Sequence, residues 1–282
     1  MAKMEMQNVT LTYGQRSVVR ELSLHIYPGE LLGLVGPNGC GKTSIIKALS
    51  HVLIPDAGRI LLDGQELGAI SRTELARLIG VVPQNPSLPD TFTVFEVAIL
   101  GRNPHLGLLS GETARDMAVV WQAMEKIGIT HLAKRRIGEL SGGEKQRVTI
   151  ARVLAQEPQV ILMDEPTANL DIFQQMDILD LITGMCREKN TAGLIAIHDL
   201  NIAAQYCTRI IMLKNGQIHA EGMPKEVVTA ENVREVFGAD TTVYPHPENN
   251  LPMVLPNTGC RHSGNGNKEK HTNKVHLKLA EN

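Results

Sequence analysis

A glycine-rich segment early in the chain carries the residues needed to hold a phosphate chain. Residues 36–43 have the sequence GPNGCGKT, which fits the pattern GxxxxGK[ST], and they lie between an apolar run at 31–35 and apolar residues at helical spacing. Glycines let successive backbone N–H groups converge on phosphate oxygens, and the start of a helix favours an anion. Lys42 can bridge the β- and γ-phosphates, and the Thr43 hydroxyl can bind Mg²⁺. This segment predicts a nucleoside triphosphate site.

Two adjacent carboxylates follow a second apolar run. Residues 160–163 are VILM, and Asp164 and Glu165 come directly after them. We expect Asp164 to hold Mg²⁺ through water and Glu165 to act as a general base on the attacking water. A plain strand end would have the same local sequence, so the prediction depends on the phosphate loop being present in the same chain.

Gln84 and His198 end two further apolar runs. Gln84 follows a short strand signal at 79–82, and His198 follows an apolar run at 193–197. Parallel strands place their carboxyl ends at one sheet edge, so both side chains are predicted to lie near the γ-phosphate. Gln84 could reach Mg²⁺ and the attacking water, and His198 could hydrogen-bond the γ-phosphate. A purely structural histidine at a strand end is the alternative.

A second helix start resembles a phosphate-accepting site. Residues 140–147 have the sequence LSGGEKQR, in which Ser141, Gly142 and Gly143 precede a predicted helix. Ser141 and Glu144 also fit a capping box, and both interpretations can hold together. A chain with two such helix starts either binds two nucleotides or shares them across an interface between two copies.

The elements that position these residues alternate between strands and helices. Short strands with tight turns are predicted to about residue 86, a mostly helical insert from 87 to 155, and buried parallel strands with a crossover helix at 171–189 thereafter. The sequence predicts an α/β protein with four parts: 1–86, 87–155, 156–245, and a C-terminal extension at 246–282 that is expected to be flexible.

Composition narrows the class of protein. The chain has 282 residues, a net charge of −2 and 3% aromatic residues, which argues against nucleic acid as a partner. The four cysteines show no metal-ligand spacing, and neither a signal peptide nor an apolar run long enough to cross a bilayer is evident. If the protein serves a membrane, we expect it to do so through a partner.

Taken together and in this order, the motifs resemble those of the ATP-binding-cassette ATPases over about residues 4 to 240. The resemblance implies a P-loop (RecA-like) ATPase core with an N-terminal antiparallel β subdomain and an inserted helical subdomain. It also implies that the signature of one subunit closes over ATP held by Lys42 of another, with Asp171 across the seam and Tyr13 stacking on adenine. The residues expected to contact ATP are Tyr13, Gly36, Asn38, Gly39, Cys40, Gly41, Lys42, Thr43, Ser44, Ser141, Gly142, Gly143 and Asp171.

One segment narrows the resemblance to a branch of this family. Residues 93–107, TVFEVAILGRNPHLG, resemble the corresponding segment of importers for iron-siderophore complexes, haem and cobalamin, as do residues 198–201 and 245–247. The resemblance implies a homodimer that drives transmembrane permease subunits from the cytoplasmic face of the cell membrane, and that works indirectly with a substrate-binding protein. The alternatives are an ATPase for another cargo, or a soluble ATPase acting on nucleic acid or the ribosome; the single cassette without a heptad run disfavours the latter.

Two cysteine-containing segments lead to further expectations. Cys40 stands beside Lys42, so its alkylation is expected to block ATP binding. Cys260 lies near three histidines in the last stretch of the chain, where a solvated tail is favoured over a metal site because the spacings fit no metal motif.

Overall fold

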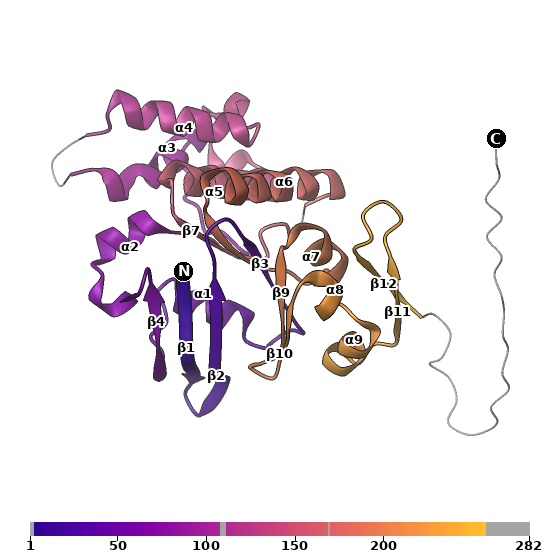
Figure 1. Ribbon diagram of the computed structural model, residues 1–282. Coiled ribbons are helices and arrows are strands. Elements are labelled where there is room, and N and C mark those ends of the chain that lie inside the picture. The colour runs from indigo at the N-terminus through magenta and orange to yellow at the C-terminus, as the bar shows by residue number, and fades with distance from the viewer. Residues whose placement is uncertain (1–2, 108–110, 169, 258–282) are drawn as a thin grey trace, which may run out of the picture.

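The computed structural model describes residues 3–107, 111–168 and 170–257. Its centre is a six-stranded sheet in the order β10-β9-β3-β8-β7-β6 (Figure 1). All neighbouring pairs are parallel except β10 with β9. The strands are β3 (Leu31–Val35), β6 (Ile79–Val82), β7 (Val160–Asp164), β8 (Ala192–Ala196), β9 (Arg209–Lys214) and β10 (Gln217–Gly222).

A four-stranded sheet in the order β2-β1-β4-β5 is built from the N-terminal part of the chain. All its pairings are antiparallel, as expected for the predicted β subdomain. The side chains of β1 alternate between buried and more exposed positions over much of its length, since one face of this sheet covers a core. Its strands are β1 (Met4–Tyr13), β2 (Arg16–Ile26), β4 (Ala57–Leu62) and β5 (Gln65–Glu66).

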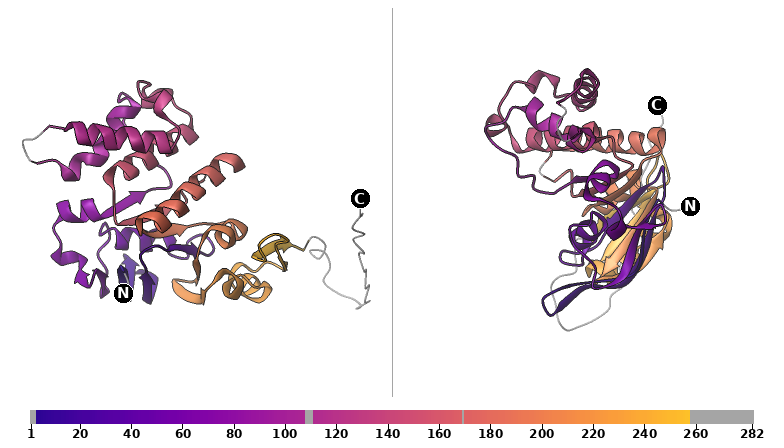
Figure 2. Two further views of the ribbon diagram at one scale, coloured as in Figure 1. Left: turned by 45° about the horizontal axis from the view of Figure 1, so that its top comes forward. Right: turned by 90° about the vertical axis from the view of Figure 1, so that its left-hand side faces the viewer.

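Three helices form the predicted helical insert at one end of the molecule. Helices α3 and α4 pack on α5, and the three lie together above the six-stranded sheet (Figures 1 and 2). Capping boxes start each of them, with Thr93, Thr113 and Ser141 as the N-cap residues. The α-helices in the part of the chain that the structure describes are α1 (Lys42–Leu49), α2 (Arg72–Leu78), α3 (Val94–Ile99), α4 (Ala114–Lys126), α5 (Gly142–Gln156), α6 (Ile172–Lys189), α7 (Leu200–Tyr206), α8 (Pro224–Val227) and α9 (Ala230–Phe237).

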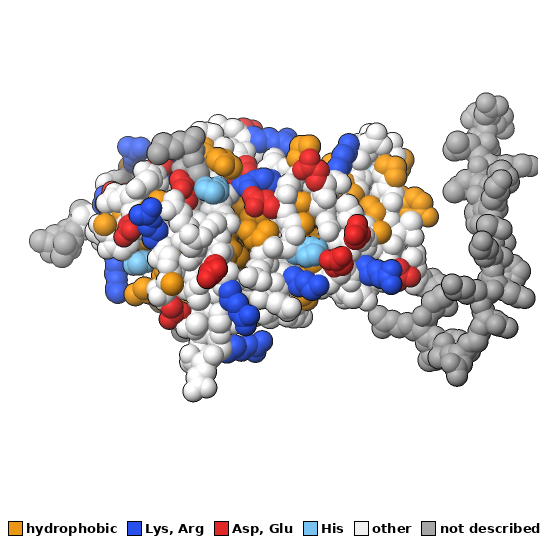
Figure 3. Space-filling model, turned by 60° about the horizontal axis from the view of Figure 1, so that its bottom comes forward, with side chains coloured by type: hydrophobic (Ala, Val, Ile, Leu, Met, Phe, Trp, Pro, Cys, Tyr) orange, Lys and Arg blue, Asp and Glu red, His pale blue; other side chains and the backbone are white. Residues whose placement is uncertain are grey.

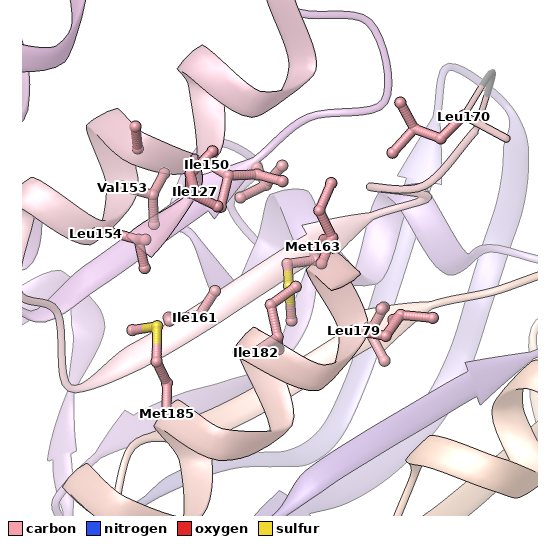
Figure 4. Packing of buried hydrophobic residues seen from close by; sticks show 14 of the residues in the cluster. Ile127, Ile150, Val153, Leu154, Ile161, Met163, Leu170, Leu179, Ile182 and Met185 are labelled. Carbon is pink, nitrogen blue, oxygen red and sulfur yellow. The ribbon is translucent and has the colours of Figure 1, made fainter. Parts of the chain in front are cut away.

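Strand β7 is buried on both faces, which explains its uninterrupted apolar sequence. Ile161 and Met163 point into a cluster formed with residues of α5 and α6 (Figure 4). Val160 and Leu162 belong to a second cluster on the other face. Because successive side chains of a strand alternate, a strand covered on both sides must be apolar throughout.

Residues 93–107 contribute Arg102 to a buried ion pair with Asp116 of α4. Arg102 is 4% exposed; its Nε donates to Asp116 Oδ1 at 2.9 Å, and its Nη1 donates to the Ala155 carbonyl at 2.8 Å and to Glu157. Hydrogen bonds from Thr113, together with Arg102, hold the pKa of Asp116 far below its usual range. Arg102 therefore fastens the segment to α4 and to the end of α5, and its side chain is not available to a partner.

Replacing Arg102 by Met is expected to destabilise the helical insert. The substitution leaves Asp116 buried without its cation, which costs more than the lost contact alone. We expect the Tm to fall by about 5 °C or more in thermal unfolding. Arg115→Met, which removes an exposed arginine from α4 next to Asp116, is the matched control, and an equal Tm for the two variants would contradict the role assigned to Arg102.

A hairpin at the end of the described chain packs against α7. Strands β11 (Thr241–Pro245) and β12 (Pro252–Pro256) pair with each other, and β12 contacts α7. Asn201 of α7 accepts a hydrogen bond from Val254 N at 2.7 Å and donates to the Val254 carbonyl at 3.3 Å. Up to residue 257, the structure therefore shows a packed hairpin where the sequence predicted a flexible extension from residue 246. The possible metal site near Cys260 lies outside the described residues.

No helix in the described ranges is long and apolar enough to cross a membrane. Acidic and basic side chains are interspersed over the face of the molecule shown in Figure 3.

Candidate functional site

The phosphate loop joins β3 to α1 in a conformation that requires glycine. Gly41 caps α1 with φ of 112°, a region that side-chain-bearing residues rarely adopt. A Cβ at Gly36 would lie 2.6 Å from the Leu213 carbonyl oxygen and 2.8 Å from Cys40 Sγ. The loop is therefore pressed against β9.

The side chain of Lys42 folds back over the start of the phosphate loop. Its side chain is nearly buried, and Nζ donates to the carbonyl oxygens of Gly36 at 2.7 Å and of Pro37 at 3.3 Å. The ammonium group is thus held at the mouth of the loop by neutral acceptors. Thr43, the next residue, is exposed, so its hydroxyl is open to a ligand.

Cys40 contributes its backbone to the loop and directs its thiol into the core. The side chain is 3% exposed and packs beneath Gly36. Burial raises the pKa of the Cys40 thiol, and the charge of Lys42 opposes that shift only in part. Alkylation of Cys40, expected from the sequence to block ATP binding, therefore requires the loop to open first.

A cleft of about 540 Å³ lies above the loop and brings predicted residues together from distant parts of the chain. Gln84 follows β6, Glu165 follows β7 and His198 follows β8, and these three strands are neighbours in the sheet. Their carboxyl ends therefore meet at one edge, above α1. The cleft is lined by Val18, Asn38, Gly39, Gly41, Lys42, Thr43, Ser44, Gln84, Glu165 and His198.

Glu165 is held between the two other polar residues at this edge. Gln84 Nε2 donates to Glu165 Oε2 at 2.5 Å, and His198 Nε2 pairs with Glu165 Oε1. Glu165 has a φ of 49°, unusual for a residue with a side chain, and its N–H donates to the Ala196 carbonyl of β8. This backbone conformation and the two partners hold the carboxylate at the cleft, where it can accept a proton from water.

Asp164 offers a carboxylate oxygen that has no partner in the described part of the chain. The residue is 6% exposed, and its Oδ1 is buried without a hydrogen bond. A buried, unpaired carboxylate oxygen is costly, and oxygen is the ligand type that Mg²⁺ prefers. Asp164 thus fits a role in holding a hydrated cation. No cluster of three or more His, Cys, Asp and Glu side chains suited to a metal occurs among the described residues, so phosphate oxygens and water must complete such a site.

The LSGGE segment lies outside this cleft. Ser141 is the N-cap of α5; its Oγ accepts from Glu144 N at 3.3 Å, while Glu144 Oε2 accepts from Ser141 N at 2.8 Å. Hydrogen bonds donated to its carboxylate by the Ser141 N–H and the Ser141 hydroxyl lower the pKa of Glu144. Ser141 and Gly142 are nevertheless exposed. The structure therefore supports the capping box and leaves this helix start facing solvent.

Four other predicted ATP contacts are also outside the cleft lining: Gly36 and Cys40 of the loop itself, and Tyr13 and Asp171 from more distant elements. Tyr13 ends β1 and is 46% exposed. Asp171 is exposed and caps α6, where its Oδ1 accepts from Gln174 N at 2.8 Å.

Val18 lines the cleft and was not predicted from the sequence. It lies on β2, with its carbonyl oxygen 3.2 Å from where a Cβ of Gly41 would stand. No local motif marks it, because only the folding of the β subdomain against the loop brings it there.

A glycine-rich loop between a strand and a helix, with carboxylate, amide and imidazole groups at the neighbouring strand ends, defines a nucleoside triphosphate-hydrolysing domain. The family model described as ABC transporter matches residues 19–168, and the chain belongs to this family. Its ATP-binding subunits are ATPases coupled to transport, and the predicted fold class and enzyme activity are confirmed.

Relatives match almost the whole chain. The ferric enterobactin transport ATP-binding protein of Escherichia coli is 40% identical over 255 residues, covering 90% of this chain and 94% of that protein. The hemin import ATP-binding protein of Pseudomonas entomophila is also 40% identical, covering 89% of this chain and 99% of that protein. The resemblance to the siderophore, haem and cobalamin importer branch is confirmed.

Solved structures show the same fold. An inward-facing metal-chelate type ABC transporter superposes with a TM-score of 0.78 at 26% identity, covering 90% of this chain and 97% of that one. A dimeric bacterial ABC transporter cassette superposes with a TM-score of 0.71 at 29% identity, covering 78% of this chain and 98% of that one.

Proposed function

We propose that this chain is the ATP-hydrolysing subunit of an importer that takes up a metal chelate, namely an iron-siderophore complex, haem or cobalamin, through a separate membrane permease. The observation that carries the chemistry is the cleft in which Glu165 stands over the phosphate loop with Gln84 and His198. The cargo class rests on relatives named for ferric enterobactin, hemin and cobalamin.

In this proposal the loop and Lys42 bind the triphosphate. The amides of Gly36, Asn38, Gly39, Cys40 and Gly41 and the side chains of Lys42, Thr43 and Ser44 surround the phosphates. When ATP enters, Lys42 Nζ exchanges the carbonyls of Gly36 and Pro37 for phosphate oxygens, a stronger charge-assisted interaction. Mg²⁺, held by Thr43, Gln84 and Asp164, would neutralise negative charge on the phosphates.

Glu165 serves as the general base, and Gln84 and His198 control when its carboxylate can accept a proton. In the structure its two carboxylate oxygens are occupied by Gln84 and His198. Recruitment of Gln84 toward the metal and of His198 toward the γ-phosphate would release the carboxylate to accept a proton from water. Hydrolysis is thereby tied to a fully occupied cleft.

The second copy of the chain supplies the remaining contacts. Ser141, Gly142 and Gly143 are absent from the lining of the chain's own cleft, and Ser141 and Gly142 face solvent. In an ATP-sandwich homodimer they would close over the phosphates held by Lys42 of the other copy, with Asp171 at the seam. Tyr13, exposed at the end of β1, would stack on the adenine.

The chain would work at the cytoplasmic face of the cell membrane. Dimer closure would drive the permease subunits between inward- and outward-facing states. A substrate-binding protein would act on the other side of the permease, without touching this chain.

Reconstitution tests the cargo and the partner together. The chain is combined with the permease and binding protein of a siderophore, a haem or a cobalamin system in liposomes, and ATP hydrolysis is measured with and without each cargo. We expect one metal-chelate system to stimulate hydrolysis and to accumulate its cargo. An amino-acid and a sugar system are tested in the same way as controls, and stimulation only by one of these would contradict the proposed cargo class.

A further inference from the structure

The outer edge of β11 carries backbone groups that are unpaired in the part of the chain that the structure describes. The Asn257 N–H donates to the Asp240 carbonyl, so this pair of residues is a hydrogen-bonded rung of the hairpin. Hydrogen-bonded and non-hydrogen-bonded pairs alternate along an antiparallel ladder. The N–H and C=O groups of Thr241 and Val243 therefore point away from β12, and no described residue pairs with them there.

The outer edge of β12, by contrast, is occupied. Val254 lies opposite Val243 in the ladder, and its outward N–H and C=O groups both bond to the side-chain amide of Asn201. The Asn201 amide thus takes the place of a neighbouring strand on this side. The open edge belongs to β11 alone.

An apolar groove of about 440 Å³ runs along the open edge. It lies between β11 and the segment that leads into α9, which contributes Val228 and Ala230 (Figure 1). Thr241 also lines the groove; it is 8% exposed, and its Oγ1 has no hydrogen-bond partner among the described residues. A buried hydroxyl without a partner is costly. The groove therefore offers an apolar lining, an unpaired hydroxyl and an open strand edge to one occupant.

The last part of the chain has the sequence pattern of a strand suited to this edge. Residues 274–279 are KVHLKL, in which Val275, Leu277 and Leu279 alternate with lysine and histidine. Such alternation predicts a strand with one apolar face. Extended peptides add to open sheet edges through main-chain hydrogen bonds, and their alternate side chains fill the adjoining pockets.

This segment is tethered at the start of the groove. Asn257, the last described residue, bonds to Asp240, which directly precedes β11. Residues 258–273 connect it to the segment, and a chain of that length spans at most about 55 Å. The five residues of β11 extend over about 17 Å. The segment can therefore reach the whole edge, and a short tether gives it a high effective concentration there.

The groove region and the end of the chain carry opposite charge. Residues 223–257, which include α8, α9 and the hairpin, have five acidic and two basic side chains, whereas residues 258–282 have two acidic and five basic ones. Opposite charges favour the approach of the two segments, and salt weakens this attraction.

We propose that residues 274–279 add to β11 of the same chain as a third strand of the hairpin sheet. Their main chain pairs with the outward groups of Thr241 and Val243, and their three apolar side chains fill the groove. The added strand covers an edge that is otherwise open to pairing with another chain. The inference goes beyond the proposed function, because the groove shares no lining residue with the ATP cleft.

Hydrogen exchange of the Val243 amide in the full chain, followed by NMR without nucleotide, tests the proposal. Leu277→Asp puts a charge into the apolar face of the segment, and Asn267→Asp adds the same charge to the same end of the chain outside it. We expect the Val243 amide to exchange about tenfold faster or more in Leu277→Asp and at the parent rate in Asn267→Asp. Equal exchange in the parent and Leu277→Asp would overturn the inference.

Two further measurements identify the occupant. Protection of the Val243 amide is expected to be independent of protein concentration; protection that rises with concentration would assign the groove to a second copy. Benzoylphenylalanine in place of Tyr244, which lines the groove and is 51% exposed, is expected to cross-link to residues 274–279 in a product of single-chain mass. Cross-links only to another copy, or only to added permease, would overturn the inference.

Discussion

Glu165→Gln is expected to lower kcat for ATP hydrolysis by about 10²- to 10⁴-fold while leaving ATP binding intact. The amide keeps the size and shape of the carboxylate, and its oxygen can still accept from Gln84 Nε2, which donates to Glu165 in the structure. It cannot take a proton from water. The loss should therefore fall on the chemical step and spare the binding step.

Two measurements distinguish this result from a folding defect. Steady-state hydrolysis gives kcat, and equilibrium titration with a fluorescent ATP analogue gives the affinity. ATP is expected to drive the variant into a dimer that persists, because hydrolysis no longer releases it. Glu188→Gln, which neutralises an exposed carboxylate on α6, is the matched control and should hydrolyse ATP at the parent rate. A parent-like kcat in Glu165→Gln would remove Glu165 as the base.

Lys42→Met is expected to weaken ATP binding by about 10- to 100-fold. The substitution keeps the apolar stem, which is buried with the rest of the side chain, and removes the ammonium group that would pair with the phosphates. It also leaves the Gly36 carbonyl without the donor that it has in the structure. The nucleotide loses a charge-assisted interaction, whereas the packing around α1 changes little.

Lys47→Met provides the control for this substitution. Lys47 lies on the same helix and is exposed, so its loss tests the general effect of removing positive charge from α1. Titration with the fluorescent analogue should show parent-like affinity for Lys47→Met and a large loss for Lys42→Met. Equal affinities in the two variants would show that Lys42 does not contact the phosphates.

Much of the fold was predictable because its signals are local. The apolar runs that became β3, β7 and β8 and the helical spacing behind α4, α5 and α6 depend on residues close together in the chain. The hairpin of β11 and β12 was missed, because its Pro- and Asn-rich sequence suggested a mobile segment. Its attachment depends on Asn201, whose amide pairs with the Val254 backbone across a long stretch of sequence.

The sequence by itself determined that the chain has a phosphate-binding loop, because the pattern of glycines, Lys42 and Thr43 is a property of the backbone between one strand and one helix. It also determined that Ser141, Gly142 and Gly143 open a helix, since a capping box is complete within four residues. These features need no distant partner to form.

Only the tertiary structure decided which groups share the cleft. Gln84, Glu165 and His198 meet because β6, β7 and β8 are neighbours in register, with Val82 beside Met163 and Asp164 beside Ala196. It also placed the Cys40 thiol in the core and Arg102 in a buried ion pair, and it left Ile172 and Phe173 of α6 exposed. Strand order, burial and side-chain direction arise from contacts between distant segments, and no short stretch of sequence contains them.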